Sequence, residues 1–285
     1  MAKHRPRYLQ SVNHALRVLS LFSPERPQWT VTQVAKNLGL GKSTASRLLS
    51  TMAAVGFVSK DLQTGRYGLG LRAYEIGLAY LSGLSLRRVA MPILEELAFT
   101  IHETVYLGLL GDGAGIYIEK ILSPLSLRVD SHIGLAVPLH ATALGKALLA
   151  SQPERYVNVV VAAGLRAYTR RTITGVHALR AELRLVRRQG FALDIEEFEE
   201  NLHCIGLPLR DHRGIVVAAF SVSGPAVRFT RQTMEKHIPH LRQAAAAIST
   251  QLGFKESHDN GKAARTKQGR SSVLRSRTLM PGKGG

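Results

Sequence analysis

Residues 31–50 read VTQVAKNLGLGKSTASRLLS, and this stretch decides the fold of the N-terminal part of the chain. A helix-turn-helix needs a small residue where two helices touch, a glycine for the turn, and apolar residues at fixed offsets that close a small core. Ala35 and Gly39 supply the first two, and the apolar positions are Val34, Leu38, Leu40, Ala45 and Leu48. Either Thr30 or Thr32 can cap the first helix, and the second helix is expected over about residues 43–55.

The flanking segments complete a winged helix. Apolar residues recur at helical spacing over residues 11–22, and Pro24 and Pro27 end that helix. After the helix-turn-helix, Phe57 begins an extended segment, DLQTGRY supplies a turn, and the chain returns over residues 67–69. Three helices followed by a hairpin, in that order, are typical of a winged helix.

The second helix of the pair carries the candidate DNA contacts. Ala45 and Leu48 are expected to face inward, so the polar residues around them project from the part of such a helix that enters the major groove. Short hydroxyls and arginine suit contacts with base edges and phosphates. With an arginine from the hairpin added, the candidate DNA-binding residues are Lys42, Ser43, Thr44, Ser46, Arg47 and Arg66.

The charge of the chain favours the same partner. The 285 residues carry a formal net charge of +18. Residues 1–75 hold 11 basic and 3 acidic side chains, residues 76–254 hold 19 and 15, and residues 255–285 hold 8 and 2. A basic head on a nearly balanced body is what an attached DNA-binding module looks like, although a generally basic or ribosome-associated protein would also carry such a charge.

The segment GLGKST also invites comparison with a phosphate-binding loop. That motif needs a glycine five positions before Gly41, where this chain has Lys36, and an apolar strand before it, which is missing. Nucleotide binding is therefore not predicted.

The body is expected to be a mainly antiparallel α+β domain. A helix over residues 71–101, with Gly83 and Pro92 as interruptions, would connect it to the head. Hairpins are expected over residues 105–121 and 204–224, LRVD at 127–130 as a further strand, and IEEFEE at 195–200 as a solvated acidic turn. Further helices are expected over 142–150, 177–189 and 232–252.

Composition places the chain in a reducing compartment. It has one cysteine, no apolar run of about 20 residues, and no apolar region behind its basic N-terminus. We therefore expect a cytoplasmic protein without a membrane partner. The Gly-, Ser- and Lys/Arg-rich tail at 255–285 is expected to be disordered.

Several segments, in order, resemble the IclR family of bacterial transcriptional regulators. In the head these are SVNHALRVLSLF, VAKNLGLGKSTASRLLSTMAAVGFV and RYGLG; in the body, IGLAVPLHATALGKALLA, TRRTITGVHAL, RRQGFALDIEE, CIGLPLRDHRG and SVSGP. The resemblance covers about residues 8–253. It implies a winged helix-turn-helix at 1–75, then a linker helix and a GAF-like effector and oligomerisation domain at 76–254, with homodimers pairing into tetramers.

The resemblance also implies an effector pocket. Carried over position by position, its residues are Ala143, Leu144, Asp194, Leu202, Cys204, Ser221 and Ser223. Free N–H groups at a helix start and two hydroxyls at alternate strand positions suit a carboxylate. Asp194 would oppose that charge, so it is expected to receive a hydroxyl or to orient a serine. Family members that sense small keto acids often have Gly-Ala where this chain has Ala143-Leu144, which leaves the effector open.

Neither a catalytic nor a metal site is predicted. His203 and Cys204 are neighbours on an expected strand, so their side chains point to opposite faces and cannot form a nucleophile with its base. His140, Cys204 and Asp194 lack metal-ligand spacing. No cofactor is expected either.

The sequence thus predicts a regulator that binds a double-stranded operator under the control of a small carboxylate. The alternative is a basic DNA-associated protein whose central domain only oligomerises.

Overall fold

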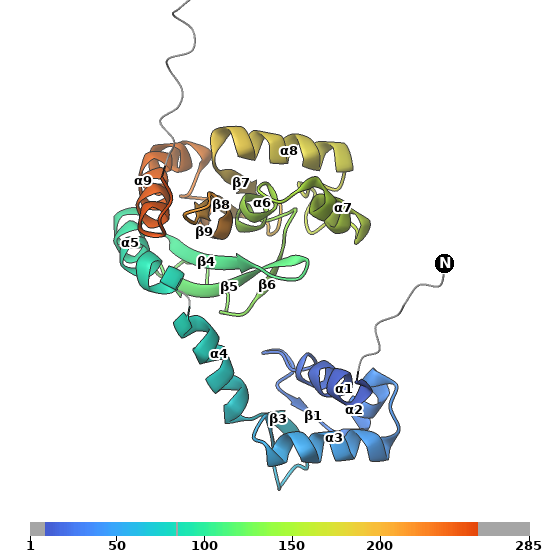
Figure 1. Ribbon diagram of the computed structural model, residues 1–285. Coiled ribbons are helices and arrows are strands. Elements are labelled where there is room, and N and C mark those ends of the chain that lie inside the picture. The colour runs from blue at the N-terminus through green and yellow to red at the C-terminus, as the bar shows by residue number, and fades with distance from the viewer. Residues whose placement is uncertain (1–8, 84, 256–285) are drawn as a thin grey trace, which may run out of the picture. The chain divides into compact units, whose positions relative to one another are not determined.

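The computed structural model describes residues 9–83 and 85–255, so most of the expected basic tail lies outside the described part of the chain. The chain divides into two compact units. The first extends to Glu103 and takes in Ser123–Leu125; the second is formed by Thr104–Leu122 and the chain from Ser126 onward. Figure 1 shows the elements of both units.

The head has the predicted winged-helix order. Its elements are α1 (Gln10–Leu19), β1 (Gln28–Trp29), α2 (Val31–Leu38), α3 (Lys42–Ala54), β2 (Val58–Lys60) and β3 (Tyr67–Leu69). The strands form an antiparallel sheet in the order β1-β3-β2, of which β1 was not predicted. A single core cluster joins the three helices to the sheet. Its residues include Val18, Trp29, Leu38, Leu49 and Tyr67.

The turn between α2 and α3 follows from two residues. Thr30 is the N-cap of α2, and it and Gln33 form a capping box in which each side chain accepts from the other residue's backbone N–H. Gly39 ends the helix in the left-handed region with φ 67°, a conformation that favours glycine. Leu49, not Leu48, is the buried leucine of α3, since Leu48 is only half-buried.

Two helices stand where a single connecting helix was predicted. They are α4 (Leu71–Gly83) and α5 (Ser85–Ile101). Gly83 ends α4 as expected, but Pro92 lies inside α5 without ending it. Proline removes one helical hydrogen bond, and the buried residues Ala90, Leu94 and Leu97 show that α5 keeps an apolar face on both sides of it. The predicted boundary between residues 75 and 76 stays a proposal.

The second unit is built on a six-stranded antiparallel sheet in the order β6-β5-β4-β9-β8-β7. The strands are β4 (Thr104–Leu110), β5 (Ala114–Ile121), β6 (Ala136–Pro138), β7 (Ala192–Ile195), β8 (Leu202–Arg210) and β9 (Val216–Pro225). The helices are α6 (Ala143–Leu149), α7 (Glu154–Ala162), α8 (Val176–Gln189) and α9 (Arg231–Gln251). The two hairpins and three of these helices were predicted; β6, β7 and α7 were not.

The prediction of a strand over residues 127–130 is wrong. In the structure this segment is irregular, because side chains of the sheet bind its backbone in place of a neighbouring strand. Thr104 Oγ1 donates to the carbonyl of Val129 at 2.8 Å, and the backbone N–H of Ser131 donates to the Tyr106 hydroxyl at 2.7 Å.

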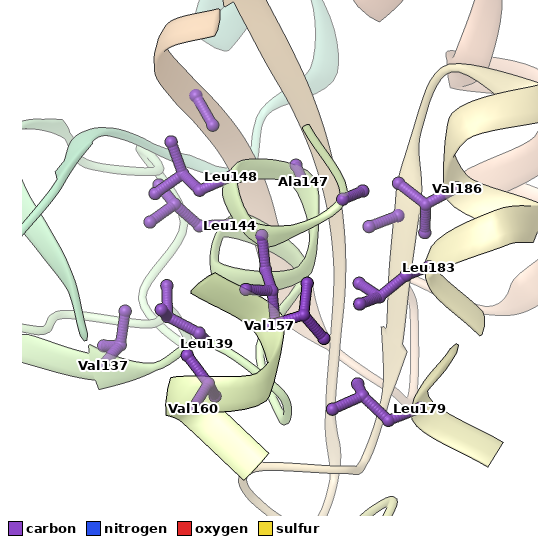
Figure 2. Close-up of a cluster of buried hydrophobic side chains, with 14 of the residues drawn as sticks. Val137, Leu139, Leu144, Ala147, Leu148, Val157, Val160, Leu179, Leu183 and Val186 are labelled. Carbon is purple, nitrogen blue, oxygen red and sulfur yellow. The ribbon is translucent and has the colours of Figure 1, made fainter. Parts of the chain in front are cut away.

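The core of the second unit lies between α6, α7, α8 and the sheet. Figure 2 shows this cluster, with Leu144 and Leu148 of α6 on the side of the strands and Leu183 and Val186 of α8 across from α6. A glycine in β8 allows α6 to approach the sheet closely. A Cβ at Gly206 of β8 would lie 2.3 Å from the carbonyl oxygen of Ala143, so the first turn of α6 rests directly on the strand.

Candidate functional site

The strand register brings the predicted pocket residues together. Asp194 of β7 pairs with Cys204 of β8, and Cys204 pairs with Ser223 of β9. Ser221 pairs with Gly206, and because Gly206 has no side chain, α6 occupies the space beside it. The sheet thus presents a carboxyl, a thiol and two hydroxyls next to the first turn of α6.

All seven predicted effector-binding residues line one cavity in the second unit: Ala143, Leu144, Asp194, Leu202, Cys204, Ser221 and Ser223. We call this cavity the effector pocket. Its volume is about 20 Å³, enough for roughly one water molecule, so a larger ligand requires the walls to move.

Seven further residues line the effector pocket and were not predicted: Tyr106, Tyr117, Val129, Ser131, Thr142, Phe198 and Glu199. The two tyrosine rings stack with centroids 4.4 Å apart. Val129 belongs to the irregular segment that was expected to be a strand, and Ser131 follows directly after that segment. Thr142 could have been found, since a threonine before a helix is a cap signal, and its Oγ1 accepts from the backbone N–H of Gly145.

Two polar atoms in the effector pocket make no hydrogen bond of good geometry, although Ser221 lies close enough to the Tyr117 hydroxyl to oppose the rise that burial causes in the pKa of Tyr117. Asp194 Oδ1 accepts from the backbone N–H of Glu197 at 2.8 Å, but Oδ2 is buried and unpaired, as is Ser221 Oγ. An unsatisfied buried polar atom is costly. Both atoms are therefore available to a ligand.

Burial sets the protonation of the pocket. The pKa of Asp194 is raised to about 7, chiefly by burial and also by the nearby Glu197 carboxylate, against the backbone hydrogen bond from Glu197 and the charge of Lys146. Burial also raises the pKa of the Cys204 thiol well above its ordinary value, so it is no nucleophile. No lysine or arginine lines the pocket.

The turn after β7 is held from several sides. Lys146 of α6 is fully buried, and its Nζ contacts Glu197 Oε1 at 2.5 Å and Glu182 Oε1 at 3.3 Å. The hydroxyl of Thr172 donates to the carbonyl of Glu197, and that of Thr169 to the carbonyl of Glu196, both at 2.6 Å. The prediction of a solvated acidic turn is thus wrong for Glu197, which pairs with a lysine that the sequence did not single out.

The head presents the predicted DNA-binding residues on one helix and one hairpin. Lys42, Ser43, Thr44 and Arg47 of α3 are exposed, and Ser46 is half-buried. Arg66 is half-buried at the base of the β2–β3 turn, where its carbonyl accepts from the backbone N–H of Asp61. Asp61 braces the turn through Thr64, whose hydroxyl lowers the pKa of the Asp61 carboxyl.

Comparison with known proteins identifies these two parts. The model of the IclR helix-turn-helix domain matches residues 11–62, and that of the C-terminal domain of the bacterial transcriptional regulator IclR matches residues 78–250. The chain belongs to the IclR family. Its relatives are transcriptional regulators, not enzymes, and a helix-turn-helix regulator binds DNA.

Individual relatives of this IclR-family chain align over most of its length. The regulator KdgR of Escherichia coli is 36% identical over 251 residues, which is 88% of this chain and 95% of the relative. The IclR transcriptional regulator of Alicyclobacillus acidocaldarius is 28% identical with a TM-score of 0.77, over 87% of this chain and 100% of the other. An IclR homologue from Microbacterium hydrocarbonoxydans, solved in complex with 4-hydroxybenzoate, is 28% identical with a TM-score of 0.74, over 85% and 98% of the two chains.

Among the described residues, no helix is both long and apolar enough to cross a membrane.

Proposed function

We propose that this regulator binds a pseudo-palindromic operator as a dimer, and that a small hydroxy carboxylate in the effector pocket sets its operator affinity. The observation that carries the proposal is the buried pair of unpartnered atoms, Asp194 Oδ2 and Ser221 Oγ, in a cavity lined by all seven predicted residues. A ligand hydroxyl would donate to Asp194, and the ligand carboxylate would accept from Ser221 and Ser223.

The chemistry of the wall explains why the ligand needs a hydroxyl. Asp194 and Glu199 line the effector pocket without a cationic side chain, so a bare carboxylate would meet only like charge. Ser221 and Ser223 offer hydroxyl donors but no positive charge, and the seven-residue α6 is too short for its dipole to supply the attraction alone. A related protein solved with 4-hydroxybenzoate, which has both groups, supports this ligand class.

The operator would be read by the exposed residues of α3 in each of two heads. One helix contacts only a few base pairs, so a dimer with half-sites about one helical turn apart doubles the contacts. Dimers pairing into tetramers, and action in the cytoplasm, belong to the same proposal. The effector would act through α5 and α4, which lie along the chain between the helix-turn-helix domain and the six-stranded sheet.

Operator affinity measured for head variants tests the DNA half of the proposal. Arg47→Ala should cost about 1–3 kcal/mol and relax specificity at one base pair if Arg47 contacts a base. Lys42→Ala should weaken all sequences alike and reduce the salt slope by about one. Lys236→Ala, which removes an exposed charge from α9, is the matched control. Unchanged footprints and affinities for both head variants would contradict the assignment of α3.

Operator affinity titrated with hydroxy, keto and aromatic acids tests the effector half. An acid that acts on the wild type should act on Ser221→Ala/Ser223→Ala only at a clearly higher concentration, while binding of the unliganded variant to DNA stays intact. Thr250→Ala, an exposed hydroxyl on α9, controls for loss of a hydroxyl elsewhere. An equal response of the double variant would place the effector elsewhere. If no acid acts at all, the result favours the alternative, in which the second unit only oligomerises.

A further inference from the structure

A second, larger cavity lies at the opposite end of α6 from the effector pocket. It has a volume of about 270 Å³ and is walled by the end of α6, the end of α8 and strand β8. This volume is just below the range of about 300–1,000 Å³ that is usual for small-molecule pockets, so the cavity suits a small ligand. It shares no lining residue with the effector pocket. We call it the arginine cavity.

Two arginines from different walls give the cavity its charge. Arg187 of α8 donates through Nε to the carbonyl of Ala150, and Arg210 of β8 donates through Nη1 to the carbonyl of Gly214 at 2.9 Å. Neither has an ion-pair partner among the described residues. A guanidinium has five N–H donors, so each arginine is positioned by a backbone carbonyl and keeps other donors for a ligand.

The other lining residues determine which shape of ligand fits the cavity. Half-buried Pro208 gives the wall its apolar surface, and Ala147 and Val186, which Figure 2 shows on facing sides of α6 and α8, are buried behind the wall. Ser151 adds an exposed hydroxyl at the end of α6. A cavity with an apolar surface and two unpaired guanidiniums suits a molecule with an anionic head and a small apolar body, because arginine binds planar carboxylates and phosphates bidentately.

We propose that the arginine cavity binds a small organic anion, with its carboxylate or phosphate between Arg187 and Arg210 and its apolar part against Pro208. The site is separate from the effector pocket, so this regulator would take two small molecules, one near each end of α6.

Calorimetric titration of the full chain tests the proposal, with inorganic phosphate, phenyl phosphate and benzoate as probes at about 0.15 M salt to screen non-specific attraction. Phenyl phosphate should bind more tightly than inorganic phosphate, and its comparison with benzoate identifies the preferred head group. Arg187→Gln and Arg210→Gln should each weaken binding at least tenfold. Arg188→Gln removes the same charge from an exposed neighbour that does not line the cavity, and it should bind like the wild type.

A third variant separates loss of the site from loss of the fold. Ser151→Asp leaves both arginines in place but brings a carboxylate to the rim, where it should compete with the probe and weaken binding at least tenfold without changing the thermal unfolding temperature. Ser151→Asn, which adds no charge, should bind like the wild type. The proposal is overturned if no probe binds the wild type, if Arg188→Gln weakens binding as much as Arg210→Gln, or if a folded Ser151→Asp variant binds normally.

Discussion

At the scale of single residues, Asp194 combines deep burial with an incompletely hydrogen-bonded carboxyl group. One of its oxygens is satisfied by a backbone N–H, and the other is buried without a partner. Protonation relieves this, since a neutral carboxyl is cheaper to bury than a carboxylate, and its pKa of about 7 reflects that preference. An effector hydroxyl would supply the missing partner.

The raised pKa of Asp194 predicts a pH-dependent stability. From pH 3.8, the ordinary pKa of the group, to about pH 7, the folded state keeps a proton that the unfolded state loses. The stabilisation from protonated Asp194 is therefore complete below pH 3.8 and is lost as the pH rises to 7, by about 1.4 kcal/mol per unit at most. Asp194→Asn does not titrate, so the free energy of unfolding of the wild type, minus that of the variant, should fall across this window and be constant above it. Urea unfolding at several pH values measures the difference. Parallel profiles would contradict the assignment.

The buried pair of Lys146 and Glu197 predicts that replacing Lys146 lowers the stability of the protein, and that the loss depends on whether Glu197 remains charged. Lys146→Met leaves Glu197 without its cation in a buried place, and breaking a buried pair costs about 3–5 kcal/mol. Lys146→Met/Glu197→Gln removes the orphaned charge as well and should be more stable than the single variant. Urea unfolding followed by circular dichroism compares them. If the double variant is the less stable of the two, Glu197 is not destabilised by loss of the lysine.

The residues of the effector pocket could be predicted only in part, for reasons visible in the register. Asp194, Cys204 and Ser223 lie in one row across three strands, and the resemblance to the family was needed to connect them, since they are far apart in sequence. Lys146 and Glu197 were missed because a lysine in an apolar helix and a glutamate in an acidic run look solvated. Only the packing of α6 on β8 buries them.

At the scale of elements, local chemistry made α2 predictable and left its cap undecided between two threonines. The structure selects Thr30, whose Oγ1 accepts from the backbone N–H of Gln33. Thr30→Ala should destabilise the head by about 1 kcal/mol, the usual cost of losing an N-cap. Thr32→Ala, at an exposed position, should cost less. Fluorescence of Trp29, the only tryptophan of the chain and part of the head core, follows the unfolding. Equal effects of the two variants would contradict the capping role.

The contact of α6 with β8 predicts that Gly206 tolerates no side chain. Its Cβ would lie 2.3 Å from a backbone oxygen that no rotamer change can move, so Gly206→Ala should cost about 1–3 kcal/mol. Gly175→Ala in the same unit is the control, since its Cβ would meet nothing closer than 3.8 Å. Thermal unfolding of the two variants should differ clearly. A Gly206→Ala variant as stable as the control would show that α6 can move off the strand.

Elements with strong periodicity were predictable; of the short strands, β2 and β3 were predicted from the turn between them, and β1 and β6 were not. In α8 and α9 the helical spacing of apolar residues repeats over three turns or more, whereas β1 and β6 have only two and three residues. The sequence LRVD has the composition of a strand but lies where side-chain hydroxyls of β4 bind its backbone. Such tertiary contacts override local propensity.

At the scale of the whole molecule, the uneven charge predicts what the C-terminal segment adds. Residues 255–285 hold 8 basic and 2 acidic side chains, and all but the first lie outside the described residues. Because phosphate attraction is independent of sequence, deleting 255–285 should lower affinity for random DNA and the salt slope, while the ratio of operator to random affinity stays constant or rises. Fluorescence anisotropy at several salt concentrations measures both. A truncated protein that loses its preference for the operator would give the segment a specific role.

The effector pocket has one wall made of strands and one made of irregular chain. Cys204, Ser221 and Ser223 lie in a hydrogen-bonded ladder, while Val129 and Ser131 are held by side chains of the sheet, namely the hydroxyls of Thr104 and Tyr106 and the Lys120 ammonium group. Irregular segments tolerate insertion and substitution far better than paired strands do. Substitutions at Val129 and Ser131 should therefore change the shape of the effector pocket while leaving the polar groups of the paired strands in place.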